Sequence, residues 1–169
     1  HAYANWRHDP ARATGDTLGT PPFVRFWGDA SDRDRKSTTF VATAAALLST
    51  SDPAPAAVLT RLERTLRDID RGKRMRAPAA TIALRRAALL EGLVRAHLLL
   101  DNKQEAAAYS KRLLDVAPRS RIAYVLHNDA LWRVGDLEGL KASAKARLDH
   151  ERTGDLAAQT LSSVELAQG

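Results

Sequence analysis

The chain has 169 residues, the length of one ordinary domain, and 44% of them are hydrophobic, enough to build a buried core. Only 5% are aromatic, and Ala, Leu and Val supply most of the apolar residues. This composition favours helices over a β-sandwich or a barrel. The absence of cysteine excludes a disulfide scaffold, a cysteine-ligated zinc site and thiol catalysis.

The formal net charge of +6 is concentrated in one segment. Residues 61–86 carry nine Lys or Arg against three Asp or Glu, whereas the rest of the chain is balanced overall. A local excess of this kind predicts a basic patch on a neutral scaffold rather than a generally basic protein.

Two features bear on the compartment and on membranes. Because the first residue is His1 rather than Met, we expect a processed or cloned fragment, which a signal peptide or membrane anchor could have preceded. No run of about 18 apolar residues occurs, so we expect no transmembrane segment here. The lack of cysteine is compatible with the cytoplasm or a bacterial periplasm, and the localisation stays open.

The first 30 residues differ from the rest of the chain, because they combine proline, glycine and aromatic residues. We expect an irregular arm at residues 1–30 whose aromatic side chains pack onto a single helical domain at residues 31–169. Alternatively, these aromatic side chains contact a neighbouring domain or partner.

From Ser31 onward, apolar residues recur at helical spacing, and turn signals divide the chain into about six or seven helices. Asp52-Pro53 is typical of a helix start, Gly72 of a left-handed terminator, and Gly135 of a helix end. No segment alternates polar and apolar residues as a strand does. The helices are expected at about residues 32 or 37–48, 52–70, 78–100, 103–116, 120–134, 137–150 and 154–166.

Two turns match at a shift of 34 residues. Asp101-Asn102-Lys103-Gln104-Glu105-Ala106 aligns with Gly135-Asp136-Leu137-Glu138-Gly139-Leu140, each at the turn into the second helix of a hairpin. With its tight turn at Asp101, small residue at Ala106 and terminal Pro118, this part of the chain resembles the tetratricopeptide repeat. Residues 87–118 form the better copy and 121–152 the weaker one. The resemblance implies antiparallel helical hairpins in a right-handed α-solenoid.

The second copy departs from the family pattern, since Arg152 stands where a proline is usual. The packing positions of the first helix also differ: Leu90, Leu93, Val94 and His97 become Tyr124, His127, Asn128 and Leu131.

The resemblance also implies a binding groove, because the first helix of each tetratricopeptide hairpin lines a concave surface that holds an extended peptide or a partner helix. Trp132 beside Arg133 is a candidate contact pair, since interfaces favour both residue types. Alternatively, Trp132 caps the core between the fifth and sixth helices. By position, the groove residues are Glu91, Arg95, Leu98, Leu99, Val125, Asp129, Trp132 and Arg133.

The basic segment forms a stripe on the second expected helix. Its arginines follow spacings of three, three and four, which keeps them on one face, opposite the apolar residues. Such a stripe can bind phosphates, anionic lipid headgroups or an acidic protein. Alternatively, it is a solvated face that Glu63, Asp68 and Asp70 partly neutralise. The basic patch comprises Arg61, Arg64, Arg67, Arg71, Lys73, Arg74 and Arg76.

The sequence offers no catalytic machinery. The five histidines lack metal-ligand spacing, and His97 and His127 fit better as hydrogen-bonded core or groove residues. His8-Asp9 pairs a base with a carboxylate but has no nucleophile, and no phosphate loop, nucleophile elbow or dinucleotide motif occurs. We therefore expect no catalytic residue, no cofactor and no metal.

The expected function is a non-catalytic protein–protein interaction or scaffold module, part of a larger bacterial protein or assembly, with a protein or peptide as its partner. The alternative is a nucleic-acid or anionic-surface binder that acts through residues 61–76. A third reading, a helical enzyme that uses the arm and His8, ranks last.

Overall fold

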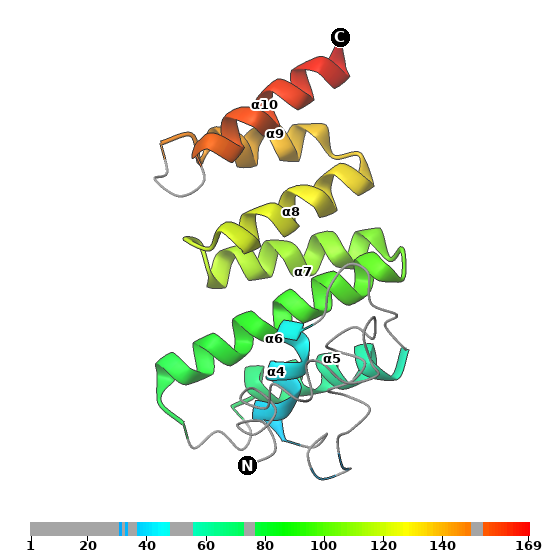
Figure 1. Ribbon diagram of the computed structural model, residues 1–169, viewed down its shortest axis with the longest axis vertical. Coiled ribbons are helices and arrows are strands. Elements are labelled where there is room, and N and C mark those ends of the chain that lie inside the picture. The colour runs from blue at the N-terminus through cyan, green and yellow to red at the C-terminus, as the bar shows by residue number, and fades with distance from the viewer. Residues whose placement is uncertain (1–30, 32, 34–36, 48–55, 73–76, 150–153) are drawn as a thin grey trace, which may run out of the picture.

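The computed structural model describes residues 31, 33, 37–47, 56–72, 77–149 and 154–169 (Figure 1). These residues form seven α-helices and no strand, so the prediction of an all-α protein is confirmed for this part of the chain. The expected arm at residues 1–30 and the Asp52-Pro53 helix start lie outside the described residues. The helices are α4 (Thr38–Leu47), α5 (Ala56–Asp70), α6 (Ala79–Leu99), α7 (Lys103–Val116), α8 (Arg121–Val134), α9 (Leu137–Lys145) and α10 (Gly154–Gln168).

The helices from α6 to α10 lie side by side in chain order along the long axis, each running opposite to the one before (Figure 1). Consecutive helices therefore form antiparallel hairpins. At one end of this stack, α4 and α5 pack against α6. The α6 helix consequently has neighbours on several sides, and it also contacts α8.

The main core is centred on the second half of α6. Leu89, Leu90, Leu93 and Val94 are fully buried there, and residues of α4, α5, α7 and α8 complete the cluster. Burying one such side chain contributes roughly 1.5–3 kcal/mol, so this half of α6 anchors the domain. Smaller clusters around Tyr124 and around Leu140 continue the packing toward α10.

The α4 helix crosses α6 at a glycine. A Cβ atom added to Gly92 would lie 2.5 Å from the Cβ and 2.8 Å from the Cα of Ala45, which is closer than carbon atoms approach. The absence of a side chain at Gly92 therefore allows the two backbones to pack directly against each other.

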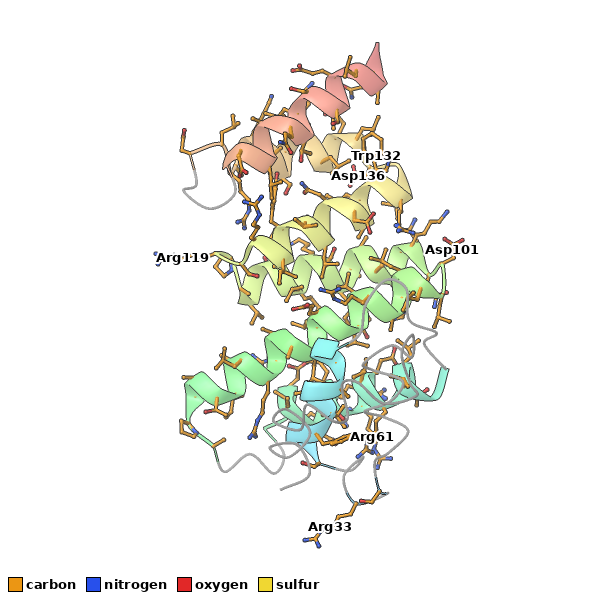
Figure 2. All side chains as sticks on the ribbon, viewed as in Figure 1. Arg33, Arg61, Asp101, Arg119, Trp132 and Asp136 are labelled. Carbon is orange, nitrogen blue, oxygen red and sulfur yellow. The ribbon has the colours of Figure 1, made fainter. Side chains whose placement is uncertain are left out.

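The turns after α6 and α8 lie at the same edge of the stack, and the labelled Asp101 marks the first of them (Figures 1 and 2). Asp101 has a φ of 58° and Gly135 has a φ of 76°, both in the left-handed region. Glycine adopts this conformation freely, and aspartate is one of the few other residues that tolerates it. The two aligned positions therefore have the same function, which is to end a helix.

Hydrogen bonds repeat in these two turns with the same 34-residue shift. The backbone N–H of Asn102 donates to the carbonyl of His97 at 2.9 Å, and that of Asp136 donates to the carbonyl of Leu131 at 3.0 Å. Each bond closes the end of its helix across six residues. The sequence repeat thus corresponds to a repeat of backbone structure.

Most expected helix bounds agree with the structure to within one or two residues, but the sixth expected helix is shorter than predicted. It was expected to reach residue 150, whereas α9 ends at Lys145 and residues 146–149 form turns. Beyond α9, the Arg147 guanidinium donates to the Pro118 carbonyl and lies over the Tyr124 ring. These tertiary contacts hold the chain in a turn where the local sequence favours another helical turn.

Candidate binding surfaces

A hollow of about 320 Å³ lies between α8 and α10, with Leu140 of α9 at its side. Its volume is at the lower end of the roughly 300–1,000 Å³ that small-ligand sites occupy, so it suits one or two amino-acid residues. The walls are mainly apolar, with hydroxyl and amide groups between them. The lining residues are Tyr124, Val125, Asn128, Asp129, Trp132, Leu140, Leu156, Gln159, Thr160 and Ser163.

Three of the groove residues expected from the repeat pattern, Val125, Asp129 and Trp132, line this hollow. Arg133 lies beside them, and its Nε donates to Asp129 Oδ1 at 3.1 Å. The only charged side chain among the lining residues is therefore already paired.

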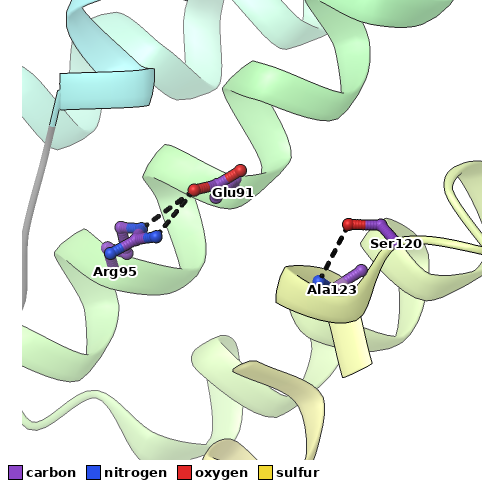
Figure 3. A network of polar contacts seen from close by, with 4 residues as sticks. All are labelled: Glu91, Arg95, Ser120 and Ala123. Carbon is purple, nitrogen blue, oxygen red and sulfur yellow. Dashed lines mark hydrogen bonds and ion pairs between the residues drawn. The ribbon is translucent and has the colours of Figure 1, made fainter. Parts of the chain in front are cut away.

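The expected groove residues on α6 are not part of the hollow. Leu98 is buried in the main core, and Leu99 packs against that core while remaining partly exposed. Glu91 and Arg95 form an ion pair with each other at 2.7 Å along α6, which Figure 3 shows. The structure thus places these four residues apart from Val125 and Trp132.

Trp132 is 49% exposed, although it is the largest apolar side chain on α8. Figure 2 labels it near the end of α8 that leads into α9. This exposure is too high for a residue that caps a core between α8 and α9. Trp132 forms part of the wall of the hollow instead.

Polar groups connect α8 to α10 at the floor of the hollow. Asn128 Nδ2 donates to Thr160 Oγ1 at 3.0 Å, and the Thr160 hydroxyl donates to the Leu156 carbonyl at 2.8 Å. Asn128 Oδ1 and the Tyr124 hydroxyl are enclosed, and neither has a hydrogen-bond partner among the described residues.

The α10 residues of the hollow were not assigned from the sequence. The repeat was followed only to residue 152, although α10 has the same pattern of buried residues as α8. Ala157 and Val164 are fully buried and seven residues apart, as are the buried Tyr124 and Leu131. This spacing is the signal by which the sequence could have identified α10 as a third first-helix.

The α5 helix separates apolar from basic side chains, as its sequence indicates. Arg64, Arg67 and Arg71 are exposed on one side and are called here the arginine face. Arg61 is half-buried, and its Nε has no hydrogen-bond partner among the described residues. The opposite side is buried in the core through Val58, Leu62, Leu66 and Ile69. Lys73, Arg74 and Arg76, the rest of the basic patch, lie outside the described residues.

Two carboxylates of α5 pair with neighbouring helices rather than with the arginine face. Asp70 forms ion pairs with Arg86 of α6 at 3.1 Å and with Arg112 of α7 at 2.9 Å. Glu63 Oε1 lies 3.8 Å from Nε2 of His97. In the described part of the chain, no carboxylate forms an ion pair with the arginine face, whose positive charge is left uncompensated.

The two helical histidines are buried and hydrogen-bonded, as expected. Nδ1 of His97 accepts from the Asn102 amide at 3.4 Å, and its ring stacks on Tyr109. Nδ1 of His127 lies 3.0 Å from Ser110 Oγ. The Ser110 hydroxyl already donates to the Ala107 carbonyl, so His127 must be the donor in this pair.

Burial lowers the pKa of both histidines. For His97, desolvation outweighs the carboxylates of Glu63 and Glu105, which raise the pKa. For His127, desolvation is the main cause, and the positive charges of Lys111 and Arg147 lower the pKa further. Both rings therefore favour the neutral form in the folded protein.

Other kinds of site are not found within the described ranges. They contain no group of three or more His, Asp or Glu side chains that could hold a metal ion. None of their helices is both long and apolar enough to cross a bilayer. His8 and Asp9, the residues of the enzyme hypothesis, lie outside the described residues.

Comparison of the chain with protein-family models, curated proteins and solved structures found no match. The tetratricopeptide resemblance therefore stays a prediction that depends on the repeated turns and the packing of this chain.

Proposed function

We propose that this chain is a non-catalytic interaction module whose hollow between α8 and α10 binds a segment of a partner protein. The observation that carries the proposal is the half-exposed Trp132 in the wall of a mainly apolar hollow. A tryptophan held open to water gains most when a partner covers it, and such residues dominate the energy of protein interfaces.

The same proposal includes a tetratricopeptide-like right-handed solenoid as the scaffold of this hollow. Three observations support it: the two equivalent turns 34 residues apart, the antiparallel hairpins, and the contact between α6 and α8 across α7. In this arrangement α6, α8 and α10 are the first helices of successive hairpins. A protein that works in this way is a scaffold component of a larger bacterial protein or assembly.

The proposal is tested by selecting a random displayed peptide library on the immobilised protein. The selected peptides should bind the wild type and lose about tenfold or more in affinity to Trp132→Ala, because truncating a central interface tryptophan typically costs 2 kcal/mol or more. Ile122→Ala is the matched control, since Ile122 lies on the same helix, is also 49% exposed and does not line the hollow. Peptides that bind both variants equally well would contradict the proposal.

A second candidate function, binding to phosphate-bearing polyanions, is favoured by the arginine face. Three exposed arginines on one side of α5 have no carboxylate partner among the described residues, whereas other bases such as Arg86 and Arg112 do. Guanidinium groups make bidentate hydrogen bonds to phosphate, and a row of them along a helix follows a line of negative charges.

The second candidate is tested with the triple variant Arg64→Gln, Arg67→Gln, Arg71→Gln, which keeps the helix propensity of α5. Binding to a short DNA duplex should weaken, and the salt dependence should fall by about one unit per arginine lost. The control, Lys111→Gln, Arg119→Gln, Lys145→Gln, removes the same charge from exposed positions on the other side of α6. Equal effects of the two triple variants would reduce the binding to net charge and exclude a site on α5.

A further inference from the structure

We propose that the hollow recognises a main-chain amide: the N–H of a partner residue donates to Asn128 Oδ1, while the apolar side chain of that residue packs beside Trp132. This inference rests on the proposed function and specifies the chemistry of its ligand.

The argument begins with the orientation of the Asn128 amide, which Thr160 fixes. A threonine hydroxyl has one hydrogen, and that of Thr160 is donated to the Leu156 carbonyl. Towards Asn128, Thr160 can therefore only accept, so the NH₂ group of Asn128 faces Thr160. The carbonyl oxygen of the amide, Oδ1, consequently points away from Thr160 and requires a donor.

Asn128 Oδ1 is enclosed and has no donor among the described residues. The folded protein thus already bears the cost of removing this acceptor from water, and any ligand N–H that reaches it restores the lost hydrogen bond. The Tyr124 hydroxyl is fully buried and also has no partner. It can donate to a ligand carbonyl.

The remaining lining determines which ligand supplies both groups. Val125, Leu140 and Leu156 favour an apolar side chain, and the single lining carboxylate, Asp129, is already paired with Arg133. A charged ligand therefore finds no free counter-charge in the lining. An uncharged amino-acid residue within a peptide supplies one donor, one acceptor and an apolar side chain, which together match this site.

A partner can reach Asn128 Oδ1 if α10 moves slightly away from α8. The α10 helix packs chiefly against α9, and the Asn128–Thr160 hydrogen bond and the exposed Arg121–Asp155 ion pair are among the polar links between α8 and α10. We therefore expect the signals of α10, and of Thr160 in particular, to change when the hollow is filled.

The test uses two probes that differ in one hydrogen-bond donor. N-acetyl-L-leucine dimethylamide has a single N–H, and its ester analogue has oxygen in place of that N–H. Each is titrated into ¹⁵N-labelled protein, and the signals of the Trp132 indole and the Asn128 side-chain amide are followed. The N–H probe should bind the wild type about five- to tenfold more tightly than the ester. The ratio should fall to about one in Asn128→Leu.

Gln159→Leu is the matched control, because it makes the same change from amide to leucine within the same hollow and should preserve the discrimination. Thr160→Val should reduce it, since the Asn128 amide loses the partner that orients it. A lower melting temperature without loss of discrimination in Asn128→Leu would assign Asn128 a purely structural role and overturn the inference.

Equal binding of the two probes to the wild type overturns the inference, whether or not any variant folds. If both probes shift the Trp132 signal equally, the hollow still binds apolar groups, and the proposed function stands without amide recognition. If neither probe shifts it at the solubility limit, the inference is likewise overturned, while the peptide selection with Trp132→Ala tests the proposed function separately.

Discussion

The imidazole of His127 lies between α7 and α8, where it donates to Ser110 Oγ in a buried pair. Because burial lowers the pKa of His127 and of His97 below 6.5, the unfolded chain binds protons before the folded chain does as the pH falls. The free energy of unfolding should therefore be greatest above about pH 6.5 and decrease below it.

Replacing His127 by glutamine should make stability less dependent on pH, because one of these two groups is removed while a side-chain amide can still donate to Ser110. Urea unfolding at pH values between about 5 and about 7.5 should show a smaller loss for His127→Gln than for the wild type. The remaining slope is attributed partly to His97. If the variant and the wild type lose stability equally, His127 is not a group whose protonation destabilises the fold.

At the scale of elements, the crossing of α4 and α6 depends on Gly92. Gly92→Ala improves helix propensity by about 1 kcal/mol, but its methyl group would collide with Ala45. Overpacking of this kind costs about 1–3 kcal/mol, so we expect a net destabilisation of about 1–2 kcal/mol in urea unfolding.

Ala45→Gly gives the test of this mechanism, since it restores the space that the new methyl group requires. The double variant Gly92→Ala, Ala45→Gly should be more stable than the sum of the two single effects, by about 1 kcal/mol of favourable coupling. Additive effects would indicate that the contact between the two backbones is not what makes glycine necessary at this position.

Helix positions were largely predictable from the sequence because their signals are local. The fourth expected helix matches α7 at both ends, and Ser120, placed at the start of the fifth, caps α8 by accepting from the N–H of Ala123 (Figure 3). The end of α9 was wrong because Arg147 is held by residues about 25 positions earlier in the chain. Local propensity contains no information about such a contact.

At the scale of the whole molecule, the candidate sites depend on packing between distant segments. The repeat pattern singled out Val125, Asp129 and Trp132, but the opposite wall comes from α10, and the amide of Asn128 is oriented by a residue 32 positions later. Leu98 was expected in a groove and is buried, because α6 is covered by several helices.

The charge pattern shows the same dependence on packing. The sequence predicted an arginine stripe on α5, and the exposed Arg64, Arg67 and Arg71 agree with it. Which carboxylates neutralise the stripe could not be read from their spacing, because Asp70 pairs with bases on α6 and α7. The net charge of +6 is therefore expressed at one end of a stack whose other helices are close to neutral.

The equivalence of the turns at Asp101 and Gly135 has a consequence for how such a chain changes in length. Because the backbone returns to the same geometry after 34 residues, duplication or loss of one such unit leaves every remaining hairpin facing a neighbour of the same shape. Stability then changes by one hairpin and one interface at a time. The architecture can thus be lengthened or shortened in whole units without redesign of the helices that remain.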